Sequence, residues 1–209
     1  MGEDPRRFAP AAARNREPIL EVLRRVLPAR GKVLEIGCGS GEHAVFFARA
    51  MPSLAWFPSD PDTDARVSTA AWIGHEALTN VAPPVAIDVR DDEWGVENEA
   101  PFDAIISLNM VHIAPWACAL GLIQGAARLS APGAILFLYG PFKMDGRHTS
   151  PSNEAFDTSL KARNAEWGVR DMEEIKRVAE AAGFVLDEIA SMPANNFSLV
   201  FKFAAATSR

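Results

Sequence analysis

The sequence predicts a single α/β domain, residues 1–209, in which helices cover both faces of a doubly wound, seven-stranded, mostly parallel sheet. Short apolar segments alternate along the chain with segments of helical periodicity. Two apolar segments, Ala104–Ile106 and Ile135–Leu138, contain no polar residue, which is typical of strands covered on both faces. The last two apolar segments are joined by the short link 191–196, so they form a hairpin that makes the last strand antiparallel.

The first part of the chain predicts a helix, a strand, a glycine-rich turn and a second helix. In the N-terminal helical segment, residues 1–30, apolar residues recur at helical spacing from Ile19 to Leu27. Asn15 is the expected N-cap, and Pro18 is expected in the first turn, where proline is tolerated. The elements expected next are a strand over Lys32–Ile36, a helix over Glu42–Met51 and a strand over Leu54–Phe57.

The rest of the chain continues this alternation and ends in the hairpin. A Pro132-Gly133 turn precedes the fifth strand, and Gly183 ends the last helix. The expected helices are Pro115–Leu129 and Asp171–Ala182. The expected strands are Val85–Ile87, Phe102–Leu108, Ala134–Tyr139, Phe184–Ile189 and Phe197–Phe203.

The composition predicts a soluble globular protein that acts on a small molecule. Hydrophobic residues make up 48% of the chain and charged residues 23%, and the formal net charge is -6. A negative molecule does not attract nucleic acid or an anionic membrane as a whole. No apolar run approaches the roughly 20 residues that cross a bilayer, and the N-terminus has no apolar signal core. We therefore expect a cytoplasmic protein; the oligomeric state is not indicated.

Cysteine and histidine are too few and too scattered for a structural metal site or a disulfide framework. Cys38 and Cys118 are the only cysteines, which fits a reducing compartment. The four histidines are not clustered, so we expect no metal. Two of them, His43 and His75, are expected on helix surfaces.

The segment Val33–Gly41, with the sequence VLEIGCGSG, predicts a binding site for a nucleoside-type cofactor. Glycines between a buried strand and a helix let the backbone approach a ligand closely. Only Ser40 separates Gly39 from Gly41, whereas the dinucleotide fingerprint has two residues at this point. The carboxylate of Glu35 would also repel a phosphate. A cofactor without phosphates and with positive charge, such as S-adenosylmethionine, fits better.

Polar residues follow the next three predicted strands. Ligands of a doubly wound sheet lie beyond the carboxyl ends of its strands. Asp60 lies about 20 residues past the glycine turn, where an acid accepts both ribose hydroxyls. Asp88, with the apolar Val89 beside it, is placed to accept from an adenine amine, and Asn109 ends the fourth strand. Each acid has an alternative interpretation as a loop cap or a solvated charge, but together they indicate one pocket.

These residues resemble the motifs of class I S-adenosylmethionine-dependent methyltransferases. VLEIGCGSG resembles the first motif, Asp60 the second, Ile87–Val89 the third and Phe102–Ile113 the fourth. The resemblance implies the Rossmann-like methyltransferase fold, with S-adenosylmethionine as the cofactor. The residues that it places at the cofactor are Glu35, Gly37, Cys38, Gly39, Gly41, Asp60, Asp88, Val89 and Asn109.

Segments later in the chain are similar to a narrower, methyltransferase-like family catalogued as a domain of unknown function. These segments are Gly140–Phe142, Thr149–Asn153, Phe156-Asp157, Trp167–Asp171 and Met192–Asn196. That family has no settled substrate, so the resemblance implies the reaction only by class.

The candidate catalytic residues lie after the fourth and fifth strands. If the acceptor is a hydroxyl or a protonated amine, a general base accelerates transfer by about 100- to 10,000-fold. His112 and His148 are the candidate bases, and Tyr139 is placed to orient an acceptor. Each has a structural alternative: His112 as a helix-start residue, His148 in a solvated loop and Tyr139 in the core. Positioning alone also accelerates methyl transfer, so a catalytic side chain is not required.

The sequence leaves two functions open. The first is methyl transfer from S-adenosylmethionine to a small-molecule acceptor. The alternative is a regulatory or interaction protein that binds S-adenosylmethionine without transferring the methyl group, because a fold does not determine function. A nucleotide-sugar or NAD oxidoreductase is disfavoured by the glycine spacing.

Overall fold

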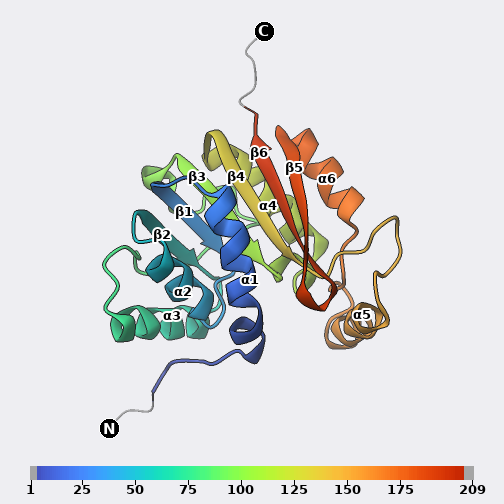
Figure 1. Cartoon of the computed structure of the whole chain (residues 1–209), viewed down its shortest axis with the longest axis horizontal. Coiled ribbons are helices and arrows are strands. Elements are labelled where there is room, and N and C mark those ends of the chain that lie inside the picture. The colour runs from blue at the N-terminus through green and yellow to red at the C-terminus, as the bar shows by residue number, and fades with distance from the viewer. Residues whose placement is uncertain (1–3, 205–209) are drawn as a thin grey trace.

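The computed structural model describes residues 4–204, which contain one six-stranded sheet with the strand order β2-β1-β3-β4-β6-β5 (Figure 1). Strands β2, β1, β3 and β4 are parallel, and β6 runs antiparallel to both β4 and β5. The strands are β1 (Gly31–Ile36), β2 (Leu54–Ser59), β3 (Phe102–Leu108), β4 (Ser130–Gly140), β5 (Phe184–Met192) and β6 (Asn196–Phe203). The expected α/β class and the antiparallel last strand are confirmed.

Helices cover both faces of the sheet, as Figure 1 shows. The helices are α1 (Pro10–Val26), α2 (Glu42–Ala50), α3 (Thr63–Glu76), α4 (Trp116–Leu129), α5 (Pro151–Arg163) and α6 (Met172–Ala181), with short 3-10 helices η1 (Glu97–Glu99), η2 (Met110–His112) and η3 (Pro193–Asn195). An apolar cluster lies on each face of the sheet. One cluster contains side chains of α1 and α2, and the other contains side chains of α4 and α6. In β3, Ala104 and Ile106 pack in the first cluster and Ile105 in the second. This alternation explains why the strand has no polar residue.

The sheet has six strands and not seven, because Val85–Ile87 forms no ladder. Val85 makes a single bridge to Ser59, and Val81 makes another to Trp56, beside the outer strand β2. Pro83 and Pro84 lie between the two bridging residues and have no backbone N–H to donate. The segment therefore follows the edge of the sheet without joining it as a strand.

Helix α1 begins five residues before the expected N-cap. Pro10 occupies its first turn, and the alanines that follow are strong helix formers, so the helix starts before Asn15. Pro18 consequently lies inside the helix, and Asn15 is a half-buried helical residue. None of the helices among residues 4–204 is both long and apolar enough to cross a membrane.

The parallel register brings the carboxyl ends of three strands to one edge of the sheet. Ile36 at the end of β1 pairs with Ser59 at the end of β2 and with Ser107 near the end of β3. The glycine turn, Asp60 and Asn109 follow these strands directly and therefore lie next to one another.

Candidate functional site

A cavity of about 620 Å³ opens at this edge of the sheet, within the range for small-molecule sites. Of the nine residues predicted to contact a cofactor, seven line it: Gly37, Cys38, Gly39, Asp60, Asp88, Val89 and Asn109. Glu35 and Gly41 are not among the lining residues. The remaining wall is mostly apolar and comes from α1, the segment after β3, the start of α4 and Trp167.

The glycine turn has backbone angles that residues with a side chain rarely adopt. Gly37, Gly39 and Gly41 have φ values of +75°, +56° and +87°. The amides of Gly37 and Cys38 both donate to the carbonyl of Ser59 at 2.9 Å, which ties the turn to the end of β2. A Cβ at Gly41 would lie 2.6 Å from Thr69 Cα on α3. Gly41 therefore permits close packing behind the turn, whereas Gly39 faces the cavity, where its Cβ would meet no protein atom within 4 Å.

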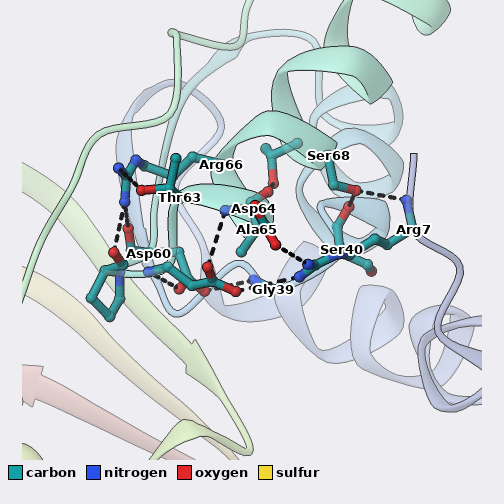
Figure 2. Close-up of polar contacts among 12 residues, drawn as sticks. Arg7, Gly39, Ser40, Asp60, Thr63, Asp64, Ala65, Arg66 and Ser68 are labelled. Atoms are coloured by element: carbon teal, nitrogen blue, oxygen red, sulfur yellow. Dashed lines mark hydrogen bonds and ion pairs between the residues drawn. The ribbon is translucent and has the colours of Figure 1, made fainter. Parts of the chain in front are cut away.

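Asp60 connects the glycine turn to the start of α3 (Figure 2). Its Oδ2 accepts from the Gly39 amide at 2.9 Å, and its Oδ1 accepts from the Asp62 amide at 2.9 Å. Arg66 donates to the Asp60 carbonyl at 2.8 Å. These contacts hold the carboxylate at the cavity wall, and each oxygen retains a lone pair for a ligand hydroxyl.

Asp88 lies at the cavity wall together with Val89 and Arg90. Arg90 donates through its Nε to Asp88 Oδ1 at 2.9 Å and through its Nη2 to Oδ2. These hydrogen bonds, with the Arg90 charge, lower the pKa of Asp88 below its ordinary value. The carboxylate is therefore ionised at neutral pH, and the only cation that lines the cavity among the described residues is already paired with it.

Asn109 has a left-handed backbone, with a φ of +62°. Its amide donates to the Tyr139 carbonyl at 2.8 Å, so the end of β3 is fixed to the end of β4. Strained backbone of this kind is frequent at functional sites. The conformation turns the chain into η2 and leaves Asn109 and Met110 on the cavity wall.

Glu35, predicted to face the cofactor either directly or through water, is turned into the protein and does not line the cavity. The side chain is 1% exposed, and Trp56 donates its indole N–H to Oε2 at 2.7 Å. Burial raises the pKa of Glu35 to about 7, against the opposing hydrogen bond from Trp56, and the charge of Asp60 adds to the rise. Glu35 therefore lies beneath the glycine turn as a carboxyl group that is partly protonated at neutral pH.

Replacing Glu35 with Gln is expected to stabilise the fold above pH 7. In the folded protein the Glu35 carboxyl keeps its proton up to about pH 7, whereas in the unfolded chain it loses its proton near its ordinary pKa of 4.5. The free energy of unfolding of the wild type therefore decreases as the pH rises from about 4.5 to about 7. This difference corresponds to about 3 kcal/mol, and Gln retains an acceptor for Trp56. Urea unfolding should show little difference between the two proteins at pH 4 and the full difference at pH 8. If the free energies of unfolding of the two proteins differ by the same amount at pH 4 and pH 8, the pKa of Glu35 is not raised.

His112 does not fit the role of general base, because it lies behind the cavity wall. The side chain is fully buried, its Nδ1 accepts from the Arg170 amide at 3.1 Å, and its carbonyl accepts from the Gly168 amide at 3.0 Å. Burial, with a contribution from the Arg170 charge, lowers the pKa of His112 to about 3. A neutral His112 therefore joins η2 to the segment that carries Trp167.

His148 also lies away from the cavity, in a cluster around the buried carboxylate of Asp157. Its Nε2 is 3.2 Å from Asp157 Oδ2, and the ammonium groups of Lys161 and Lys143 lie 2.8 and 3.5 Å from the same oxygen. Asp157 Oδ1 accepts from the Val169 amide at 2.7 Å. The cluster therefore joins α5 to the loop after β4 and to the segment before α6, and the structure does not support a general base at His148.

The cavity residues that were not predicted as site residues include two polar residues from helices, Asn15 on α1 and His43 on α2. His43 Nε2 lies 2.8 Å from Asn15 Oδ1. His43 is half-buried and lines the cavity, so its assignment to the helix surface was wrong; burial and the charge of Arg16 lower its pKa to about 4. Tyr139 is 2% exposed and does not line the cavity; burial raises its pKa, against a side-chain hydrogen bond from Asn15. The helical periodicity predicted Asn15 as an N-cap, so nothing in the sequence indicated that Asn15 contacts His43.

The fold matches solved methyltransferase structures at low sequence identity. An O-methyltransferase family protein from Burkholderia thailandensis is 19% identical with a TM-score of 0.79, over 94% of this chain and 58% of that one. A putative sarcosine dimethylglycine methyltransferase from Galdieria sulphuraria is 15% identical with a TM-score of 0.74, over 93% and 87%. A methyltransferase of calicheamicin biosynthesis, described in an SAH-bound form, is 16% identical with a TM-score of 0.72, over 91% and 53%.

These likenesses show the Rossmann-like methyltransferase fold, and the chain spans little more than half the length of the first and third of these proteins. A family model described as "Protein of unknown function (DUF938)" matches residues 6–203, which is nearly the whole chain. The protein belongs to this family of unknown function, DUF938.

Proposed function

We propose that the protein transfers a methyl group from S-adenosylmethionine to a small-molecule acceptor. The observation that carries the proposal is the convergence of Gly37, Gly39, Asp60, Asp88 and Asn109 on one cavity at the carboxyl edge of the sheet. Asp60 would bind the ribose hydroxyls, while Asp88 and Val89 would bind the adenine. When bound, the cofactor supplies a methyl group activated by its positively charged sulfur.

The donor set fits this cofactor better than a dinucleotide. The carboxylate of Asp60 lines the cavity beside the glycine turn and has no ion pair among the described residues, whereas Asp88 is paired with Arg90. The Asp60 carboxylate attracts a sulfonium and an ammonium but repels a pyrophosphate. The SAH-bound calicheamicin methyltransferase, which shares the fold, supports the same choice.

For the transfer itself, we propose that the chain positions the reactants and excludes water. His112 and His148 lie off the cavity, and orienting two reactants contributes roughly 7–11 kcal/mol without any proton transfer. This absence of the two expected bases from the cavity wall equally favours the second candidate, a protein that binds S-adenosylmethionine without transferring its methyl group.

The test begins with calorimetric titration of the purified protein with S-adenosylmethionine and S-adenosylhomocysteine. We expect both to bind, and absence of heat and of a thermal shift with either would refute both candidates. Extract is then incubated with methyl-labelled donor, with and without the protein. A labelled product that requires wild-type protein and disappears with Gly39→Arg supports transfer, because arginine at that position fills the cavity. Binding without any labelled product supports the second candidate.

A further inference from the structure

The cavity extends across the carboxyl edge of the sheet from one face to the other. At one end its wall contains Ile87, Val89 and Cys118, which belong to the apolar cluster on the α4 face. At the other end the wall comes from α1 and the start of α2, the helices of the opposite face. The glycine turn and Asp60 lie between these ends.

We infer that Asn15 and His43 bind the amino-acid end of the cofactor, an assignment that rests on the proposed function. The cofactor is elongated, with adenosine at one end and an amino acid at the other. With the adenine at Asp88 and Val89 and the ribose at Asp60, the amino acid extends past the glycine turn toward α1 and α2. Asn15 and His43 are the polar side chains that α1 and α2 contribute to this end of the cavity.

The chemistry of the pair fits a zwitterion, which carries both a donor and an acceptor. Asn15 Oδ1 faces His43 Nε2 at 2.8 Å, so the Asn15 amide nitrogen is directed elsewhere and has two N–H groups. These N–H groups are able to donate to a carboxylate. The second ring nitrogen of the neutral His43 has no hydrogen-bond partner among residues 4–204 and is available to an ammonium group.

The charges around the pair are of both signs. Arg16, one residue beyond Asn15, is close enough to lower the pKa of His43, and its guanidinium stacks 4.6 Å above the Phe46 ring. It makes no ion pair with the described part of the chain, so its positive potential is available to a carboxylate. Glu42 is the nearby acid, and its Oε2 accepts from the Ala9 amide and from Ser40 Oγ.

Comparing two ligands tests the assignment. S-adenosylhomocysteine has the amino acid, whereas 5′-methylthioadenosine has the same adenosine and thioether without it. The variants are Asn15→Leu, which keeps the branched shape of the side chain without its polar atoms, and His43→Phe, which keeps the ring that stacks on Phe47 at 5.4 Å. We expect each variant to weaken S-adenosylhomocysteine about 10-fold or more and 5′-methylthioadenosine less than about 2-fold, because a hydrogen bond to a charged group contributes at least a factor of that size.

The control is His75→Phe, a change at an exposed histidine of α3, which should alter neither affinity. If Asn15→Leu and His43→Phe weaken both ligands equally, the pair has only a structural role and the inference is wrong. It is also wrong if S-adenosylhomocysteine binds the variants as tightly as wild type. If wild type binds neither ligand, the proposed function itself fails, which a calorimetric titration distinguishes from the other two results.

Discussion

Asp60→Ala is expected to weaken S-adenosylhomocysteine binding by about 100- to 10,000-fold. The carboxylate would accept two ribose hydroxyls, and a hydrogen bond to a charged group contributes roughly 1.5–3 kcal/mol. The change also removes the acceptor of the Gly39 amide, so the glycine turn loses one of its attachments. Calorimetry or equilibrium dialysis measures the affinity, and circular dichroism confirms that the variant is folded.

Asp91→Ala is the matched control for this change. Asp91 is an exposed acid close to the cavity in sequence, and it does not line the wall. Its replacement removes the same charge from the protein, so it should leave the affinity within about 2-fold of wild type if the contact and not the net charge matters. Equal losses in both variants would show that Asp60 acts only through long-range charge.

Asp157→Ala is expected to lower the free energy of unfolding by about 1–3 kcal/mol, the usual cost of leaving a buried hydrogen-bond donor without its acceptor. Asp157 is 4% exposed and accepts from Lys161 and from the Val169 amide, while Lys143 and His148 also face it. Its loss leaves the ammonium groups of Lys143 and Lys161 without their common carboxylate and the Val169 amide without its acceptor. Urea denaturation at pH 7 measures the effect.

The pH dependence separates the charge of Asp157 from its size. Burial raises the pKa of Asp157, but the hydrogen bonds from Lys161 and Val169 and the neighbouring charges lower it below its ordinary value of 3.8. The stability that the carboxylate contributes is therefore present above pH 3.8 and is lost as the pH falls further. The difference in the free energy of unfolding between wild type and Asp157→Asn should therefore become smaller below pH 3.8. A constant difference would indicate that packing alone is responsible.

Much of the fold was predictable because its strands have a simple pattern. Ala104–Ile106 has no polar residue, and the structure packs its side chains alternately into the two apolar clusters. The hairpin of β5 and β6 was predictable because the link between them is short. Val85–Ile87 was misjudged, since an apolar segment beside a sheet edge has the same composition as a strand and only its hydrogen bonds distinguish the two.

Much of the cavity wall was also predictable, because its residues follow strand ends that parallel pairing brings together. Gly37, Gly39, Asp60 and Asn109 all come from this edge and line one cavity. The positions of the two candidate bases were not predictable. His112 and His148 are polar residues after strands as well, and their sequence positions do not reveal their contacts with Arg170 and Asp157.

The sequence by itself determined the α/β class, the hairpin, the glycine turn and most of the residues that line the cavity. These features depend on neighbours in the chain or on parallel strands, whose ends coincide. Only the tertiary structure decided that Glu35 faces Trp56, that the two candidate bases lie off the cavity, and that Asn15 meets His43 across 28 positions of the chain. Those contacts depend on how helices and loops pack across the sheet, and local periodicity carries no information about such long-range pairs.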